Sequence, residues 1–424
     1  MMFLLFISTC LLAFYIDLKL WRTFTPTIIT YSGVFLIILS HWFLGPVLGF
    51  INIDESVYLY LVSFIVISII SSVVSYILYP RLQFKENSNN GKDTFYNDKE
   101  NRVVVLFGFL IACVCIFYVA KSWLTLGSLV SEEFEGLLTY GIAGHSFALL
   151  VATLPFLFKA FRKNKNILVL LLVLLVYFLL FMKQVKYWVM IPLVWMIWYS
   201  IRTGFFKVNI FKTIFLCIFV ALTLFVLFFL VYFMKVVLSS QGSDVDYSRL
   251  VYDITIHFFG YLFSGVLTFS SYIEQGMFSS LKINDVWGLF SGPLNVINVL
   301  TSNDLLSLNI TRPFVTLNPG TSTVGNVPTL WGTMLIAGGY IGFVIYFFIM
   351  LFMYFLQWCS DYSKLALINY TFLSSFLFFS WFDYYYYLLM PFEVAVFICM
   401  LYIIFEVKFF NAIVFRAPEG KSVI

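Results

Sequence analysis

The sequence predicts an all-α polytopic membrane protein with about eleven transmembrane helices and one large loop outside the membrane that contains short or interfacial helices. The chain is 62% hydrophobic and 11% charged, whereas soluble domains are about 45–50% apolar and about 25% charged. Its mean hydropathy is +0.97. Apolar runs recur along the sequence, and a long polar interval at 237–330 interrupts them late in the chain.

Four consecutive parts follow from these runs. Residues 1–236 hold roughly the first eight spans, residues 237–330 form the loop module, residues 331–407 hold roughly the last three spans, and residues 408–424 form a tail. The runs lie near 1–16, 27–50, 56–79, 103–120, 139–158, 167–182, 187–201, 213–236, 331–356, 365–383 and 388–407.

Two segments allow a second interpretation. Residues 1–16 are apolar enough for a signal peptide, but no positive charge precedes them and no small-residue cleavage site follows, which favours a first span. Residues 254–270 are apolar enough for a further span, but they carry a histidine, serine and glycines. A helix that lies in the membrane interface or enters the membrane partway fits this composition better than a span does.

Basic residues indicate the orientation, because cytoplasmic loops are enriched in Lys and Arg. With the spans above, most of the 25 Lys and Arg residues fall on one side, including those of the tail. This distribution predicts an outer N-terminus, a cytoplasmic C-terminus and an outer position for 237–330. A net charge of +4, spread over short loops, is no footprint of nucleic-acid binding.

Metal and disulfide chemistry find little support in the sequence. The six cysteines fall in or beside apolar runs, and no CxxC, HExxH or HxxxH spacing occurs. We therefore expect no metal ligated by histidine or cysteine. Paired carboxylates occur at Asp54-Glu55 and at Asp244 and Asp246, where they are either a base or metal ligands or solvated loop ends.

The polar interval also holds a histidine and two arginines that are candidates for chemistry. His257 is either a general base or an interfacial anchor. Arg249 and Arg312 are candidates for phosphate binding, since a guanidinium binds phosphate oxygens through a planar fork. Lys183 and Lys186, in a short outer turn, either join such a ring of cations or reach to lipid headgroups.

Hydroxyl-bearing and small residues follow in the segment from Asn318 to Thr329, which is rich in turn-forming residues. Its hydroxyls and backbone amides, held at the membrane surface, suit sugar and phosphate recognition. Gly338, Gly339 and Gly342 in the next apolar run permit a close helix crossing.

Three segments share a pattern with a known family. They are the basic turn with Lys183 and Lys186, the start of the loop at 247–265, and Asn318-Pro319 leading to 338–342. In these segments, and in its architecture, the chain resembles the bacterial Wzy-type oligosaccharide repeat-unit polymerases, also called O-antigen polymerases. Members typically carry Arg at the short turn, where this chain carries Lys.

The resemblance implies a GT-C-like enzyme of the bacterial inner membrane that needs no cofactor. It would transfer a glycan from undecaprenyl pyrophosphate to a lipid-linked repeat unit at the periplasmic face. The implied partners are this lipid-linked oligosaccharide and the bilayer, with a polysaccharide chain-length regulator as a further one to consider and no nucleic acid. The residues that would take part are His257, Asp246, Arg249 and Arg312 in catalysis, and Lys183, Lys186, Tyr261, Asn318 and Thr321 in substrate binding.

Other functions remain open from the sequence. An O-antigen ligase or another lipid-dependent glycosyltransferase would use the same donor and a different acceptor. A lipid-linked oligosaccharide flippase would carry charges inside its spans, whereas the polar residues here concentrate in one loop. A purely structural membrane subunit would tolerate loss of 237–330.

Overall fold

A computed structural model describes residues 1–79, 98–127, 129, 131–205, 226, 229, 247–277, 286–301, 312–321 and 323–406. Its described part is predominantly helical, and seven of these helices are long and apolar enough to cross a membrane. The protein is therefore an all-α polytopic membrane protein, as the composition predicts. The predicted span at 213–236, Asp244, Asp246 and the tail from 408 lie outside the described residues.

The chain forms two compact units, each assembled from separate stretches of sequence. The first unit comprises Met1–Tyr79, Thr203–Phe355 and Phe376–Leu388, and the second comprises Pro80–Arg202, Leu356–Ser375 and Leu389–Ile424. These units group residues by contact, whereas the four parts expected from the sequence are consecutive stretches of the chain.

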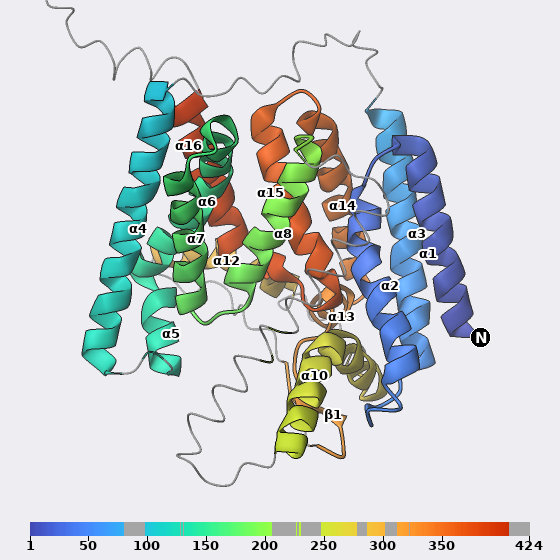
Figure 1. Ribbon diagram of the computed structural model, residues 1–424. Helices are drawn as coiled ribbons and strands as arrows, with labels where there is room; N and C mark the ends of the chain where they lie inside the picture. Colours follow the sequence, from blue (N-terminus) through green and yellow to red (C-terminus); the bar gives the residue numbers. More distant parts are fainter. Residues whose placement is uncertain are drawn as a thin grey trace, which may run out of the picture. The chain divides into compact units, whose positions relative to one another are not determined.

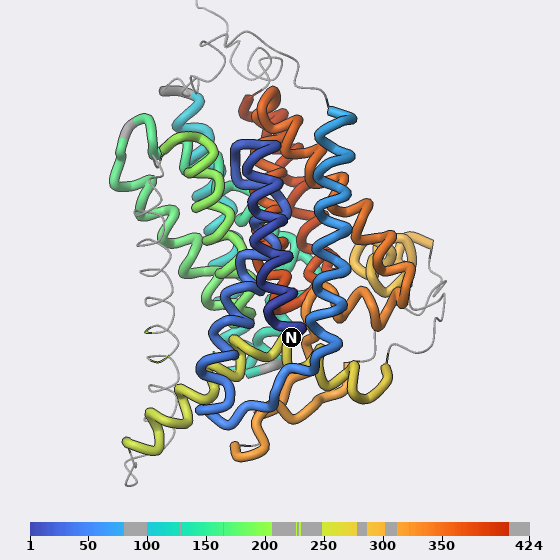
Figure 2. The backbone as a smooth tube through the Cα atoms, turned by 90° about the vertical axis from the view of Figure 1, so that its right-hand side faces the viewer, coloured from blue at the N-terminus to red at the C-terminus, as the bar shows by residue number. Residues whose placement is uncertain are grey.

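Three helices begin the first unit and pack side by side: α1 (Met2–Trp21), α2 (Pro26–Leu44) and α3 (Glu55–Leu78) (Figure 1 and Figure 2). Thr25 caps α2 by accepting a hydrogen bond from Ile28 N, and Asp54 caps α3 by accepting one from Ser56 N. Both are preferred N-cap residues. Asp54, one of the paired carboxylates noted in the sequence, therefore has a structural role in starting α3.

A buried carboxylate links these helices. Asp17 of α1 accepts hydrogen bonds from Thr25, from Ser72 of α3 and from the Tyr354 hydroxyl. Asp17 is fully buried. The hydrogen bonds from these hydroxyls, none of them a cation, offset the free-energy cost of removing its carboxylate from water. The contact ties α1 and α3 to α14 (Ile341–Ser360), most of which belongs to the same unit.

The late polar interval contributes one long helix and a small hairpin to the first unit. Helix α10 (Tyr247–Glu274) packs against β1 (Val315–Asn318) and β2 (Thr323–Gly325), which pair antiparallel. The short helices η1 (Trp287–Phe290) and α12 (Ser291–Thr301) also come from this interval. Because α10 has the length and apolarity of a membrane span, the interfacial position that the sequence favours for 254–270 stays a prediction.

The apolar run expected as one span at 331–356 is divided in the structure. Helix α13 (Leu330–Gly338) ends at Gly339, which has a positive φ of 50°, and α14 begins two residues later. A Cβ at Gly342 would lie 2.5 Å from the Met334 carbonyl oxygen, so glycine permits the close approach of α14 to α13. The glycines thus mark a break between helices here.

Two short helices form the C-terminal part of the first unit. After α15 (Lys364–Phe378), the chain forms η2 (Phe379–Trp381) and η3 (Tyr385–Tyr387). The first of these packs on α2, where Ser380 Oγ donates to the Thr30 carbonyl oxygen at 3.0 Å. The expected span at 365–383 therefore ends earlier as an α-helix, and its last residues fold onto the first unit.

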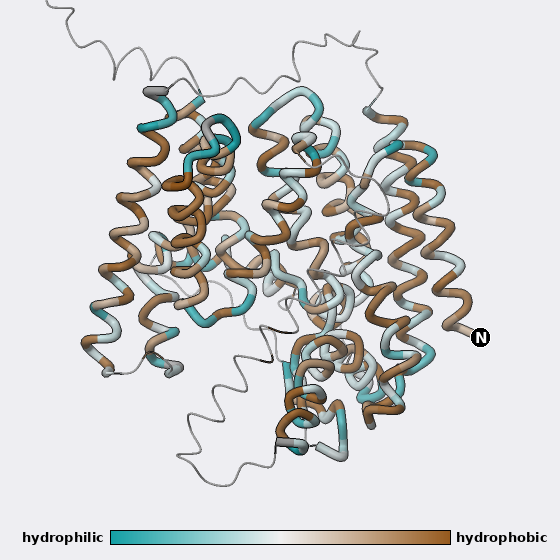
Figure 3. Tube along the Cα trace, viewed as in Figure 1, coloured by the Kyte–Doolittle hydropathy of each residue, from teal (hydrophilic) through white to brown (hydrophobic). Residues whose placement is uncertain are grey.

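The second unit consists mainly of α4 (Asp98–Leu126), α5 (Glu132–Thr139), α6 (Gly141–Asn164), α7 (Ile167–Met182), α8 (Tyr187–Arg202) and α16 (Met390–Glu406). Apolar residues run along α4 and α7, and hydrophilic residues gather near helix ends (Figure 3). Lys159 and Glu406 form an ion pair at 2.6 Å that joins α6 to α16. The short helix α5 was not expected from the sequence.

Replacement of Gly265 by alanine tests the packing of α10 on the segment after η2. A Cβ at this position would lie 2.9 Å from the Phe382 carbonyl oxygen and still closer to that of Trp381. We expect Gly265→Ala to lower the free energy of unfolding by about 1–3 kcal/mol, as overpacking does. Thermal unfolding in detergent micelles measures this. The control is Gly136→Ala in α5, where nothing lies within 4 Å of the added carbon, and a comparable loss there would contradict the expectation.

Candidate functional site

A buried ion pair connects the loop segment before β1 to the segment before η3 in the first unit. Arg312 Nη1 donates to both carboxylate oxygens of Asp383, at 3.1 and 3.0 Å. The side chains are 13% and 6% exposed. Since both charges have lost nearly all of their water, each depends on the other for compensation.

Further donors surround the Asp383 carboxylate. Tyr384 N donates to Oδ1 at 2.7 Å, while the hydroxyls of Thr333 and Tyr387 lie 3.4 Å from Oδ1 and Oδ2. The Arg312 guanidinium lies over the Tyr387 ring, 4.7 Å from its centroid. Burial disfavours the charged guanidinium, but the Asp383 charge outweighs this and raises the pKa of Arg312. The Arg312 guanidinium therefore keeps its charge at neutral pH.

This pair bears on the predicted role of Arg312 in phosphate binding. An arginine side chain has five N–H donors, and here Nη1 is bound to Asp383 while Nη2 lies 3.5 Å from the Thr333 hydroxyl. A phosphate contact would have to use the remaining donors. Sequence reasoning missed Asp383, although a lone acidic residue at the end of an apolar run is a signal that a partner exists.

One face of α10 carries His257 and Tyr261 together with small residues that contact the hairpin. The five residues 257, 260, 261, 264 and 268 share a face at helical spacing. A Cβ at Gly260 would lie 2.8 Å from the Thr323 methyl group, and one at Gly325 would lie 2.6 Å from Ser264 Oγ. These glycines allow the hairpin to lie close against the face that carries His257.

His257 and Tyr261 lie where this face is partly open. Their rings meet edge to face, with centroids 5.0 Å apart and planes at 89°. His257 is half-buried and Tyr261 is 37% exposed. The two side chains are thus one helical turn apart and both are accessible to a ligand.

The hairpin positions the predicted binding residues Asn318 and Thr321. Asn318 is buried, donates from Nδ2 to the Leu48 carbonyl oxygen at 2.8 Å, and accepts from Gly320 N at 3.0 Å. Thr321 shares a hydrogen bond of 2.8 Å with the Thr323 hydroxyl. Asn318 therefore fixes the hairpin to the loop after α2, whereas Thr321 is half-buried at the hairpin turn.

Tyr272 joins α10 to the segment that carries Arg312. Its hydroxyl donates to the Pro313 carbonyl oxygen at 2.7 Å. Helix α10, the hairpin, and the segments 312–314 and 383–387 therefore form one connected group in the first unit, which we call the α10–hairpin assembly. It includes His257, Tyr261, Arg312, Asn318 and Thr321.

Arg249 belongs to the exposed first turns of α10. Its side chain is 80% exposed, and its Nε lies 4.0 Å from Asp253, four residues further along the helix. Such exposed pairs contribute little to stability. The guanidinium is accessible, and the side chain predicted to support His257, Asp246, lies outside the described residues.

The two predicted lysines belong to the second unit, in the turn after α7. Lys186 is exposed, whereas Lys183 is fully buried. The Lys183 ammonium lies 3.4 Å from the Trp188 ring centroid and 5.4 Å from that of Phe147, and it has no hydrogen-bond partner among the described residues. Burial lowers the pKa of Lys183 to about 7, despite the opposing charge of Glu393.

Among the described residues, no group of three or more His, Cys, Asp or Glu side chains is placed to hold a metal ion. Comparison with known proteins gives one family. The model of a family of unknown function, DUF6337, matches residues 55–411, which is most of the chain. No curated protein and no solved structure matches.

The pH dependence of stability tests the burial of Lys183. Its pKa is about 7 in the folded protein and 10.5 ordinarily, so between these values the unfolded chain holds more protons and stability rises with pH. We expect Lys183→Met to be more stable than the native protein near pH 7. The difference in free energy of unfolding between the variant and the native protein should narrow towards pH 10, by about 1.4 kcal/mol per pH unit.

Thermal unfolding in micelles across this pH range measures the effect. Lys186→Met, in the same turn but exposed, is the control and should follow the native profile. A constant gap between Lys183→Met and the native protein at every pH would show that the lysine is not desolvated.

A double-mutant cycle tests the ion pair. Arg312→Ala and Asp383→Ala should each lower the free energy of unfolding by about 3–5 kcal/mol, because each leaves a buried charge without compensation. The double variant should lose clearly less than the sum. Asp361→Ala, which removes the 62% exposed partner of Arg202, should cost at most about 1 kcal/mol. Additive losses in the Arg312 and Asp383 variants would refute the coupling.

Proposed function

The chain belongs to DUF6337, a family of unknown function, and we propose that it is a membrane glycosyltransferase that joins lipid-linked oligosaccharide repeat units into a polysaccharide. The donor is a glycan on undecaprenyl pyrophosphate, and the acceptor is a hydroxyl of a second lipid-linked unit. The observation that carries this proposal is the α10–hairpin assembly, which brings a histidine, a tyrosine, hydroxyls and a cation from separate segments of the chain into one unit of a membrane protein.

The chemistry needs a base, a stabilised leaving group and a surface for sugar. In the proposed step, the acceptor oxygen forms a bond to the anomeric carbon as the bond from that carbon to the pyrophosphate oxygen breaks. The acceptor proton passes to His257, and the electron pair of the broken bond stays on the pyrophosphate. A histidine suits this role because its ordinary pKa is close to neutral pH.

Cations compensate the charge that develops on the leaving group. Arg249 is exposed and has a fork of donors that fits phosphate oxygens. Arg312 can add the donors that Asp383 and Thr333 leave. Lys186, the further cation expected from the sequence, belongs to the second unit. Tyr261 and Thr321, both accessible, are the candidates for contact with sugar.

We place this reaction at the outer face of the bacterial inner membrane, with the N-terminus outside and the C-terminus inside. The support is the excess of Lys and Arg in the loops assigned to the cytoplasm. The energy for transfer comes from the pyrophosphate linkage of the donor, so the reaction requires no nucleotide.

A ligase and a flippase are the competing functions. Inside the described helices, two buried charged groups have partners: Asp17 is bonded by hydroxyls, and Lys159 pairs with Glu406. Compensated charges of this kind hold helices together and do not by themselves favour transport.

Deletion of the gene separates the three functions. Loss of a polymerase should leave acceptors that carry a single repeat unit in place of a ladder. Loss of a ligase should leave polymer on the lipid carrier, and loss of a flippase should leave single lipid-linked units on the cytoplasmic face. Gel analysis of surface glycan and of extracted carrier lipid reads out all three, and either of the last two patterns would overturn the proposal.

Variants of α10 test the assignment of the base. His257→Ala should lower the rate of polymerisation about 10²-fold or more, the usual contribution of a general base. Arg249→Ala should also reduce polymer, and Arg249→Lys should rescue it in part because Lys lacks the planar fork. The control is Thr255→Ala, whose hydroxyl bonds back to the Val251 carbonyl oxygen of its own helix and whose Cα lies on the other side of the helix from His257.

Purified protein with lipid-linked repeat units gives these rates, and a strong chelator in the same assay tests for a metal. If the His257→Ala variant makes polymer of native length, His257 is an interfacial anchor and not the general base. Activity that disappears with chelator and returns with magnesium or manganese would move the chemistry to carboxylates such as Asp54 and Glu55.

A further inference from the structure

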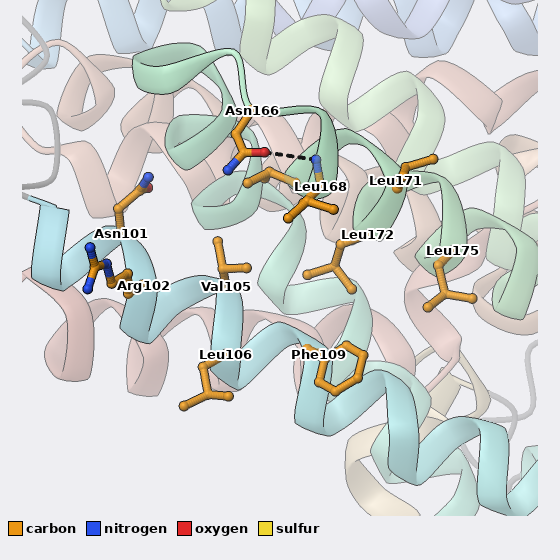
Figure 4. A pocket seen from close by; sticks show the side chains of 11 residues that line it. Asn101, Arg102, Val105, Leu106, Phe109, Asn166, Leu168, Leu171, Leu172 and Leu175 are labelled. Atoms are coloured by element: carbon orange, nitrogen blue, oxygen red, sulfur yellow. Dashed lines mark hydrogen bonds between the residues drawn. The ribbon is translucent and has the colours of Figure 1, made fainter.

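A groove runs between α4 and α7 in the second unit. Its volume is about 720 Å³, and its lining comes from both helices and from Asn166 at the start of α7. Figure 4 shows three polar residues, Asn101, Arg102 and Asn166, at one end of the groove, with leucines and Phe109 along the rest. The groove therefore has a polar mouth and an apolar wall.

The polar mouth contains a buried acceptor without a partner. Asn101 is 6% exposed, and its Oδ1 has no hydrogen-bond partner among the described residues. A buried polar atom of this kind normally finds a donor in the protein, in water or in a ligand. Asn101 also lines the groove, so a turn of its side chain would bring this oxygen, now closed off from solvent, to a ligand there.

Two further groups at the mouth can bind an anion. Arg102 is exposed at the start of α4, next to Asn101 in the chain. Asn166 caps α7, with Oδ1 accepting from Leu168 N at 2.9 Å, so its Nδ2 can donate to another group. Among the described residues that line the groove none is acidic, and basic residues end the neighbouring helix α6. The mouth is therefore complementary to a negative charge.

The apolar wall faces outward along a membrane-spanning helix. Along α7, the wall runs from Leu168 to Leu175, about 10 Å at about 1.5 Å per residue. Leu106 is 58% exposed and Leu168 is 65% exposed, which is expected of side chains that meet hydrocarbon. Helix α4 has the length and apolarity of a membrane span, and α7 is a shorter apolar helix.

We propose that this groove binds one anionic phospholipid with hydroxyls in its headgroup, of the phosphatidylglycerol type. The phosphate pairs with Arg102 and accepts from Asn166 Nδ2, and an acyl chain lies along the leucines. The Asn101 side chain turns toward the groove on binding, so that its Oδ1 accepts from a glycerol hydroxyl. Basic pockets between membrane helices bind anionic headgroups in this way. The inference concerns the second unit and does not rest on the proposed glycosyl transfer.

Native mass spectrometry of the purified, delipidated protein tests the proposal. Phosphatidylglycerol and phosphatidylcholine with identical acyl chains are titrated into the same micelles. We expect phosphatidylglycerol to bind at least about tenfold more tightly, the value of one charge-assisted hydrogen bond. Arg102→Gln should abolish this preference, and Asn101→Leu should reduce it. Lys121→Gln, an exposed cation near the other end of α4, is the matched control and should keep it.

Two further measurements keep the result interpretable if a variant at the mouth folds poorly. Leu168→Trp fills the groove from an exposed position and should weaken phosphatidylglycerol binding while leaving the protein folded. Glycerol phosphate, which has the headgroup without chains, should not compete. Equal binding of both lipids, equal losses in Arg102→Gln and Lys121→Gln, or full competition by glycerol phosphate would each overturn the proposal.

Discussion

The pairing of Arg312 with Asp383 is the interaction on which the arrangement of the first unit depends. It joins the segment before β1 to the segment between η2 and η3, and both segments also contact α10. In a low-dielectric environment, neither charge is tolerable alone. The ion pair therefore fixes the hairpin and the short C-terminal helices relative to each other. Gly260, Gly265 and Gly325 allow the backbones to approach closely enough for that pairing.

The sequence predicted the class of protein and most of its helices, because long apolar runs have a direct physical meaning in a bilayer. It did not predict the break at Gly339, the early end of α15 or the hairpin. An apolar run looks the same whether it forms one helix or two, and the positive φ of Gly339 is a matter of tertiary packing. Short strands of three or four residues leave too weak a pattern to be found.

The sequence supplied candidate residue types for the site, but it did not predict which residues they contact. His257 and Tyr261 share a face of α10 in the structure, which follows from their four-residue spacing in a helix. Asn318 was chosen as part of the turn-rich segment and of the Asn318-Pro319 motif, and the structure gives its side-chain amide a structural partner at Leu48. Lys183 was chosen for its charge, but burial over Trp188 changes what that charge can do. Sequence gives the inventory of polar groups, whereas burial and partners come from segments far apart in the chain.

The interleaving of the two units determines the order in which the protein can be completed. Ribosomes deliver residues from the N-terminus, so α1, α2 and α3 enter the membrane before the stretch Phe376–Leu388 that completes their unit exists. Until residue 383 is inserted, the Arg312 guanidinium has no carboxylate to accept its donors. The first unit thus stays incomplete through nearly the whole of synthesis. A chain that stops short of Asp383 leaves the Arg312 guanidinium without the carboxylate that compensates its charge.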